Sequence, residues 1–324
     1  MLRSSNLSLG QRSRCHACTQ GLWLMAIAGL GLSGCHHQRL PPSPTLPTHQ
    51  ATADLTEVPQ SRVAAALPPV THRTYELPTS VVQVVTVSPG SDNAVAVVLS
   101  DELAKLAHLA EANGAIAAIN AGFFDPQNGL TTSYVTVDGA IAADPRQNPR
   151  LMDNPDLQTY LPAILNRSEL RIYRCDDGVQ YDVTVHAAAV PANCTIEGAV
   201  GAGPQLLPTL TGDEEGFLAD NERGETVRDA LGSQRPNARS AVGLMADGTV
   251  VFAIATQLHN VDVATGLTLP EMADFLNRLG VQKALNLDGG SSTGLYFAGQ
   301  RYLGHLDQAG EPIERSVKSI LVIR

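Results

Sequence analysis

From about residue 75 onward, the hydrophobic residues form short runs rich in β-branched side chains and separated by turn signals. Apolar runs of this length, alternating or continuous, predict β-strands. The predicted strands cover residues 81–87, 95–99, 171–175, 179–186, 241–245 and 249–255. Asp-Gly pairs at 138–139, 177–178 and 247–248 lie between apolar runs and are typical of tight hairpin turns. The strands are therefore expected to pair in antiparallel fashion.

Two segments have helical periodicity instead. The first helix is expected over residues 101–112, with Ser100 as its N-cap. The second begins at a T-x-x-E capping box formed by Thr268 and Glu271, and it ends before Gly280. Together with the strands, this pattern predicts an α+β fold with a mixed, largely antiparallel sheet or sheets and a few packed helices.

Each predicted helix leads through a glycine into a short apolar strand. Asn120 lies six residues after Gly114, and Asn286 lies six residues after Gly280. We interpret these segments as two equivalent helix–strand arms whose strand ends bring polar side chains to one place. The alternative is a coincidence, since helix–glycine–strand units are common.

The N-terminal segment has the pattern of an export signal. Arginines precede an apolar run over residues 21–34, which is too short for an ordinary membrane span. The run ends in Leu-Ser-Gly followed by Cys35, which resembles the bacterial lipobox, in which the cysteine is lipidated. We expect export and a lipid anchor at Cys35, in the outer membrane because His36 rather than aspartate follows. A signal peptide cleaved elsewhere is the alternative.

The rest of the chain divides into a tether and one domain. Seven prolines between residues 36 and 70 are typical of an extended linker. The expected division is a signal peptide (1–34), a Pro-rich tether (35–70) and a single domain (71–324). Cys175 and Cys194 are the cysteines of that domain, and export favours a disulfide between them. Two free buried thiols are the alternative.

Composition narrows the function classes. The chain has 324 residues, of which 44% are hydrophobic, so it can bury a large core. Its net charge of −10 argues against a general nucleic-acid-binding protein, because the phosphate backbone requires a basic surface. Motifs of P-loop NTPases, zincins and lipase-like hydrolases are missing from the sequence.

A candidate site follows the second predicted arm. Asp288 ends a buried apolar run and precedes Gly289, Gly290, Ser291 and Ser292. Desolvating a carboxylate in this position costs free energy, so its presence there favours a functional role. The glycines let the backbone approach a ligand closely, and the following N–H groups can form an anion nest. A plain turn is the alternative.

Arginines are candidate ligands for an anion. Arg239 and Arg315 each stand just before an apolar run, and a guanidinium group suits phosphate or carboxylate. Structural ion pairs are the alternative for both. Gly203 lies in a Gly-Pro-Gln turn that is either part of the site or an architectural bend.

Taken together, these motifs resemble the phosphodiester glycosidase family. The similarity covers about residues 82 to 323. Six blocks occur in the family's order: residues 120–124, 203–207, 239–243, 266–273, 286–293 and 315–317. Ala121 stands where the family often has glycine, and residues 148–171 do not map onto the animal enzyme of this family.

The resemblance implies hydrolysis of a sugar-1-phosphodiester at the glycosidic bond of a glycan or phosphoglycan. It implies that Arg239 and Arg315 hold the phosphodiester, that Asp288 acts as acid/base or stabilises positive charge, and that Asn120 and Asn286 orient sugar hydroxyls or water. Asp125 is the first candidate for a second carboxylate. Other residues expected at the substrate are Gly122, Gly203, Gly289, Gly290, Ser291 and Ser292.

Other classes of function stay open at this point. The pocket could bind a glycan or wall polymer without turnover. Alternatively, Asp288 and Asn120 could ligate calcium or magnesium in a metal-assisted phosphodiesterase. The glycosidase reading requires no cofactor.

Overall fold

The computed structural model describes residues 56–57, 69–259, 261 and 263–324. The predicted signal peptide, Cys35 and most of the predicted tether lie outside these residues. No helix in the described part of the chain is both long and apolar enough to cross a membrane.

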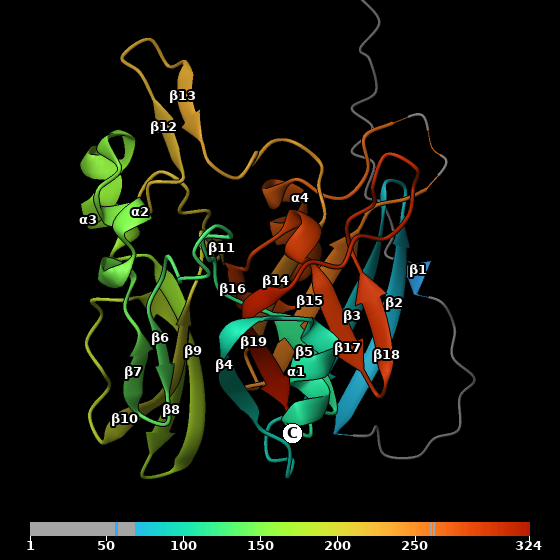
Figure 1. The fold of residues 1–324 in the computed structure, drawn as a ribbon. Helices are drawn as coiled ribbons and strands as arrows, with labels where there is room; N and C mark the ends of the chain where they lie inside the picture. The colour runs from blue at the N-terminus through green and yellow to red at the C-terminus, as the bar shows by residue number, and fades with distance from the viewer. Residues whose placement is uncertain (1–55, 58–68, 260, 262) are drawn as a thin grey trace, which may run out of the picture. The chain divides into compact units, whose positions relative to one another are not determined.

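Two sheets form the centre of the fold (Figure 1). In spatial order, the seven-stranded sheet contains β1 (Thr56–Glu57), β2 (Val70–Leu77), β3 (Ser80–Val87), β15 (Val250–Thr256), β14 (Arg239–Met245), β16 (Val281–Asn286) and β11 (Gln205–Leu207). The central five-stranded sheet contains β18 (Gln300–Leu303), β17 (Gly294–Phe297), β5 (Ala117–Asn120), β19 (Val317–Ile323) and β4 (Val95–Ala104).

A second five-stranded sheet, called here the lateral sheet, contains β7 (Ala140–Ala143), β6 (Val135–Val137), β10 (Cys194–Gly201), β8 (Ser168–Cys175) and β9 (Gly178–Val185). A separate ribbon pairs β12 (Leu218–Asp220) with β13 (Thr226–Asp229). The α-helices are α1 (Leu106–Ala112), α2 (Pro149–Met152), α3 (Leu161–Ile164) and α4 (Leu269–Arg278). Short 3-10 helices cover Pro145–Gln147, Pro155–Tyr160 and Gly290–Ser292.

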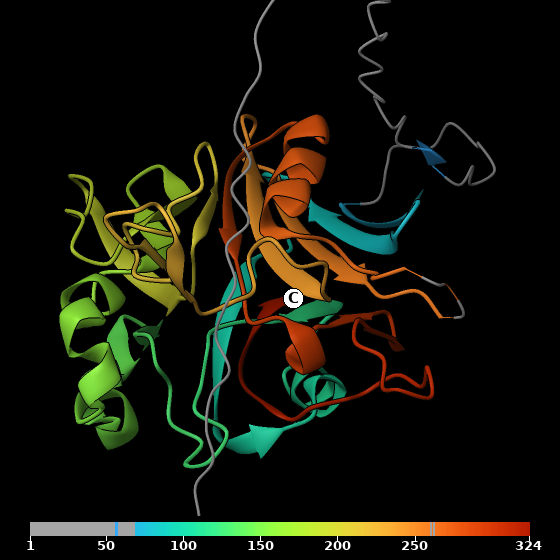
Figure 2. The same cartoon turned by 90° about the horizontal axis from the view of Figure 1, so that it is seen from above.

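The two central sheets pack face to face between two helices. Ile119 of β5 and Phe252 of β15 belong to the apolar core between the sheets, together with Leu170 of the lateral sheet. Helix α4 covers the other face of the seven-stranded sheet through residues such as Phe275 (Figures 1 and 2). Helix α1 covers the other face of the central five-stranded sheet through residues such as Leu109. This gives a layered α+β domain, and the predicted fold class is confirmed.

The hairpin and helix predictions are confirmed with one correction. Antiparallel pairing joins β8 to β9 and β14 to β15 around their Asp-Gly turns. Helix α4 begins at the predicted capping box and ends before Gly280, whose φ is +92°. The first helix is shorter than predicted, since α1 begins only at Leu106. Residues 101–104 extend β4 instead, because β4 pairs with β19 as far as the Ala104–Val317 register.

The Cys175–Cys194 disulfide is confirmed. These residues are register partners on β8 and β10, with an S–S distance of 1.97 Å. Their sequence separation of 19 residues gives an expected stabilisation of roughly 3 kcal/mol from constraint of the unfolded chain. The pairing ties two neighbouring strands of the lateral sheet.

A run of short helices joins β7 to β8. Three of them begin with the same N-cap motif. The side chains of Asp144, Asn148 and Asn154 each accept a hydrogen bond from the main-chain N–H two residues later, and a proline follows each of them. Side-chain acceptors at the N-cap and proline at the first helical position both favour helix initiation. This explains why the segment around residues 148–164 is helical, which the sequence analysis did not predict.

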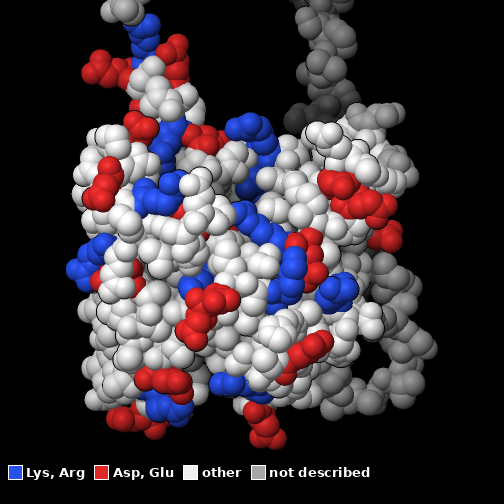
Figure 3. All heavy atoms as spheres, viewed as in Figure 1, with Lys and Arg blue, Asp and Glu red and all other residues white. Residues whose placement is uncertain are grey.

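Figure 3 shows one face of the molecule with acidic and basic side chains interspersed. Basic groups are concentrated toward the upper half and centre of this face, with acidic groups among them. Any anionic ligand on this face would therefore be recognised by a few local cations and not by a continuous basic surface.

Candidate functional site

The ends of β5 and β16 meet, as the two-arm interpretation predicts. The main-chain N–H of Asp288 donates a 2.9 Å hydrogen bond to the carbonyl of Ala121. The Asn120 side chain donates a 2.5 Å hydrogen bond to the carbonyl of Asp288. The candidate site therefore forms where one strand of each central sheet ends.

Asn120 is committed to the protein itself. Its side-chain oxygen accepts hydrogen bonds from the Ser240 hydroxyl at 2.7 Å and from the Gly294 N–H at 3.1 Å, and the residue is fully buried. Both acceptor positions of the amide and one of its hydrogens are therefore occupied. The structure gives Asn120 a positioning role in place of the substrate contact expected from the sequence.

Asp288 has an unusual acidity. Burial raises the pKa of its carboxyl to about 6, although contact with the Ser292 hydroxyl, the charge of Arg315 and the Gly289 N–H each lower it. The Ser292 hydroxyl forms no hydrogen bond of standard geometry, so its contact with Asp288 is a loose one. Both protonation states of Asp288 are accessible near neutral pH, as proton transfer requires.

Arg315 is the cation of this site. Its main-chain N–H donates to the carbonyl of Ser291 at 3.3 Å, and its guanidinium lies 5.2 Å from the centre of the Phe124 ring. Across the described part of the chain, its guanidinium has no hydrogen bond or ion pair. Half-buried beside Asp288, it is available to bind an anion.

Arg239 was expected to hold the phosphodiester, but its guanidinium binds main-chain carbonyls instead. It is 3% exposed and donates hydrogen bonds of 2.8–3.1 Å to the carbonyls of Leu267, Leu231, Gly232 and Arg235. Burial lowers its pKa to about 10. Because four of its five N–H groups are bound to main-chain carbonyls, Arg239 clamps the neighbouring loop and does not hold a phosphodiester.

Gly203 joins the site through Asn286. The Asn286 side chain donates to the Gly203 carbonyl at 2.8 Å, and the Gly203 N–H donates to the Asn286 carbonyl at 2.9 Å. The φ of Gly203 is +107°, and a Cβ at this position would lie 2.2 Å from a carboxylate oxygen of Glu215. Glycine is therefore required here, and the turn is a structural support of the site.

Glu215 is a buried carboxylate that the sequence analysis missed. It is 2% exposed and accepts hydrogen bonds from the hydroxyl and N–H of Ser168, the N–H of Gln205 and the hydroxyl of Thr211. Nothing distinguishes it in sequence from the acidic residues beside it at 213 and 214. It fixes the turn that holds Asn286.

Asp125 and Gly122 also have internal roles. One carboxylate oxygen of Asp125 accepts from the Gln127 N–H at 2.8 Å, and the other pairs with Arg150 at 2.6 Å. Asp125 therefore closes a turn, which does not support it as a second catalytic carboxylate. A Cβ on Gly122 would lie 2.7 Å from the Gly201 carbonyl, so glycine permits close approach of the lateral sheet.

The last residue of β16 and the segment that follows it also hold polar atoms without hydrogen-bond partners among the described residues. Among the described residues, the Asn286 side-chain oxygen and the hydroxyl oxygens of Ser292 and Thr293 are buried without hydrogen-bond partners. Buried polar atoms usually have partners, and such exceptions mark places where water or a ligand binds. Their position beside Asp288 supports a ligand site there.

The residues of this site do not fit the metal alternative. Within the described ranges, no group of three or more His, Cys, Asp or Glu side chains is close enough to hold an ion. The oxygen of Asn120 already accepts two hydrogen bonds. The two expected ligands therefore do not form the start of an oxygen-rich shell.

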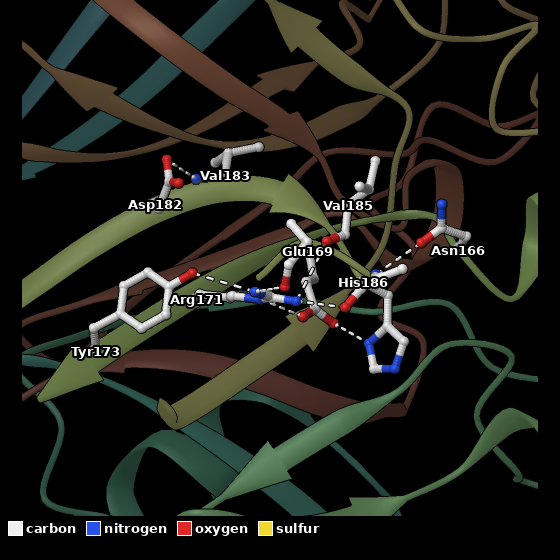
Figure 4. A network of polar contacts seen from close by, with 10 residues as sticks. Asn166, Glu169, Arg171, Tyr173, Asp182, Val183, Val185 and His186 are labelled. Carbon is white, nitrogen blue, oxygen red and sulfur yellow. Dashed lines mark hydrogen bonds and ion pairs between the residues drawn. The ribbon is translucent and has the colours of Figure 1, made fainter. Parts of the chain in front are cut away.

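A second polar cluster lies on the lateral sheet (Figure 4). Glu169 and Arg171 are each 2% exposed and form an ion pair of 2.6 Å. The Nδ1 of His186 lies 2.9 Å from the second carboxylate oxygen of Glu169, and the ring stacks on Tyr134. The sequence analysis missed this cluster; charged residues at alternate positions of a strand were the available signal.

The surface also has hollows elsewhere. One of about 460 Å³ lies between β4 and the lateral sheet, and its lining includes Val97, Arg174 and Glu197. It shares no residue with the 286–293 segment, so volume alone does not locate the site. The chemical groups around Asp288 locate the candidate site instead.

Comparison with solved structures gives similar folds at low identity. The catalytic domain of zebrafish N-acetylglucosamine-1-phosphodiester α-N-acetylglucosaminidase, auto-inhibited by its pro-peptide, is 15% identical, with a TM-score of 0.56, and 83% of this chain and 87% of that chain are covered. A hypothetical protein from Synechocystis is 18% identical, with a TM-score of 0.51, and 79% and 62% are covered, so the match spans less than two thirds of that protein.

The sequence itself identifies the family. Curated protein sequences gave no match. The family model for phosphodiester glycosidases matches residues 113–324, which include the ends of β5 and β16, Asp288 and Arg315. The chain therefore belongs to the phosphodiester glycosidase family.

Proposed function

We propose that this protein hydrolyses a sugar-1-phosphodiester in an envelope or extracellular phosphoglycan, releasing the sugar and a phosphomonoester. The observation that carries the proposal is the position of Asp288, whose pKa is about 6, beside Arg315, whose guanidinium forms no hydrogen bond or ion pair with the described residues. An acid beside an anion-binding cation is the minimum needed to cleave a bond between an anomeric carbon and phosphate.

In this mechanism, Arg315 binds the phosphodiester anion next to Asp288. The bound negative charge offsets the cation that lowers the pKa of Asp288, so the carboxyl is protonated in the complex. The bond from the anomeric carbon to the phosphate oxygen breaks, and that oxygen takes the proton of Asp288. Water bonds to the anomeric carbon and releases its proton to solvent.

The test uses the full chain. Sugar-1-phosphodiesters are incubated with wild type, Asp288→Asn and Asp274→Asn while reducing sugar and phosphomonoester are assayed. Asp274 is an exposed aspartate on α4, so it controls for the loss of a carboxylate. Both products from wild type and Asp274→Asn, and neither from Asp288→Asn, support the proposal. Full activity of a folded Asp288→Asn would refute it.

A glycan-binding protein without turnover is the second candidate. The observation that favours it is Arg239, whose guanidinium is bound to main-chain carbonyls and leaves Arg315 as the remaining predicted phosphate ligand. Glycan binding by a folded wild type that releases no product from any diester of the panel would favour this candidate.

We also propose that the protein is exported and held in the cell envelope, in the outer membrane, by a lipid at Cys35. The lipobox-like sequence supports the anchor, and the Cys175–Cys194 disulfide is typical of an oxidising compartment. Incorporation of labelled palmitate into wild type and its loss in Cys35→Ala is the expected result. Labelling of Cys35→Ala, or no labelling of wild type, contradicts it.

A further inference from the structure

The lateral sheet carries an ionisable cluster with no part in the chemistry assigned to Asp288. Glu169 and Arg171 lie on the face of β8 opposite Leu170, which belongs to the central core. The guanidinium of Arg171 also donates to the carbonyls of Val185, His186 and Ala188. A buried ion pair therefore fixes the turn that carries His186 (Figure 4).

The protonation of His186 follows from its partner. Nδ1 lies 2.9 Å from the second carboxylate oxygen of Glu169. An ionised carboxylate only accepts hydrogen bonds, so Nδ1 carries a proton and the neutral ring has its lone pair on Nε2. No described residue is hydrogen-bonded to Nε2, and the side chain is 31% exposed. Nε2 is thus the reactive edge of the ring, and protonation makes it a donor.

The ring is also held in orientation. It stacks on Tyr134 with 3.8 Å between ring centres and 3° between planes. The guanidinium of Arg146 lies 5.8 Å from the centre of the same Tyr134 ring and is paired with Asp144 at 2.6 Å. The Arg146 side chain is 59% exposed, so its outer N–H groups are accessible to a ligand.

The charges around His186 balance while it is neutral. Glu169 contacts the ring directly, and Asp144 lies within range of its charge. Each of these carboxylates is paired with an arginine, Arg171 and Arg146 respectively, and the phenol of Tyr134 is neutral. Protonation of His186 adds one positive charge to a site that is otherwise neutral. An anion that meets Nε2 and Arg146 would therefore bind more tightly to the protonated form.

We propose that His186 and Arg146 form a second, proton-linked binding site for a phosphate group. The site is connected to Asp288 through one hairpin: Phe124 lies under Arg315, Tyr134 lies under His186, and the chain between them pairs at Phe124 and Thr131. The ligand identity rests on the proposed function, because a phosphoglycan carries further phosphates beyond the one that is cleaved.

The experiment follows the imidazole resonances of the folded Asp288→Asn full chain by NMR during pH titration. The probes are inorganic phosphate and dimethyl phosphate, each compared with chloride at equal ionic strength. His186→Gln assigns the His186 resonance by removing it, and His108 on α1 serves as the internal reference. Phosphate is expected to raise the His186 pKa by about one pH unit without moving that of His108.

A matched pair of surface variants tests the guanidinium. Arg146→Gln is expected to weaken phosphate binding about fivefold. Arg174→Gln is the control, because Arg174 is similarly exposed at 63% and similarly paired, with Glu197. Neither side chain is buried, so both variants should fold.

The outcomes separate this proposal from the catalytic one. A raised His186 pKa that depends on Arg146 supports the site even if no sugar-1-phosphodiester is ever cleaved. Response to dimethyl phosphate identifies a diester of the polymer as the ligand, and response to inorganic phosphate alone identifies a free phosphate. An unmoved His186 pKa with both probes, or equal effects of the two arginine variants, overturns the proposal.

Discussion

The side-chain amide of Asn120 donates a hydrogen bond to the main-chain carbonyl of Asp288, a residue 168 positions further along the chain. This bond joins the end of β5 to the end of β16, and so one central sheet to the other. The candidate reaction centre therefore depends on the relative position of the two sheets, not on a single loop.

Asn120→Ala should destabilise the protein by about 2–4 kcal/mol. It leaves the Ser240 hydroxyl, the Gly294 N–H and the Asp288 carbonyl unpaired in a buried place. Denaturant unfolding measures the change. Asn113→Ala is the comparison, since it removes one hydrogen bond at the half-buried end of α1 and should cost about 1 kcal/mol. Equal losses in the two variants would contradict the assigned role.

Asp288 should make stability fall between about pH 4 and pH 6. Its folded-state pKa of about 6 lies above that of an unfolded aspartate, about 3.9, so the folded protein binds more protons in this range. Stability from this group is full below the unfolded value and is lost as pH rises through the folded value. Relative to wild type, Asp288→Asn should gain up to about 3 kcal/mol from pH 4 to pH 7. A pH-independent difference would argue against the raised pKa.

Arg315→Gln should lower kcat/KM by about 10- to 100-fold, the effect of losing a charge-assisted contact with the substrate. Loss of its charge also removes one of the influences that lower the pKa of Asp288. In wild type, kcat/KM is expected to fall above about pH 6, and in Arg315→Gln this alkaline limb should move to higher pH. A limb that stays in place would place the titrating group elsewhere.

Arg239→Gln should act on stability and only indirectly on binding. Four carbonyls would lose the donor that Arg239 provides, and those of Leu267 and Gly232 would keep only a main-chain donor. The loop around residues 231–235 would therefore loosen. We expect a loss of about 3 kcal/mol or more in unfolding free energy. A stable Arg239→Gln with strongly raised KM would instead return Arg239 to the role of a phosphate ligand.

Glu215→Gln should destabilise the Gly203 turn. The two main-chain N–H groups and two hydroxyls that now point at the carboxylate would face a weaker acceptor that also carries hydrogens. The expected loss is about 2–3 kcal/mol by thermal or denaturant unfolding. Glu214→Gln, on an exposed neighbour, should leave unfolding unchanged.

Local signals in the sequence predicted much of the fold. The local signals were the capping box before α4, the glycines after both helices and the Asp-Gly turns. Each acts over a few residues, so it can be predicted without knowledge of tertiary contacts. The start of α1 could not be predicted in this way, because residues 101–104 form strand through pairing with β19, more than 200 positions away. The short helices that begin at Asp144, Asn148 and Asn154, each followed by proline, also have a local sequence signal, but the sequence analysis did not predict them.

The sequence predicted where the candidate site lies better than it predicted the role of each residue there. The strand-end pattern predicted that the strand ends carrying Asn120 and Asn286 meet, and in the structure Asn120 is bonded to Asp288, just beyond Asn286. It did not indicate which polar side chains face a ligand, since Arg239 and Asp125 look equally suitable in sequence but bind carbonyls and Arg150. Glu215, Glu169 and His186 acquire their importance from burial and from partners on other strands, which no local pattern encodes.

The main chain around Asp288 is bonded to several separate segments: Leu287 to Ser240, Asp288 to Ala121, Gly290 to Ala238, and Ser291 to Arg315. These hydrogen bonds hold the main chain on both sides of Asp288 in one position. Differences in substrate choice would therefore arise in the surrounding loops, which can lengthen or change sequence while the reacting groups stay in place. Under the proposed function, the groups that cleave the bond and the loops that select the substrate are therefore separate parts of the architecture.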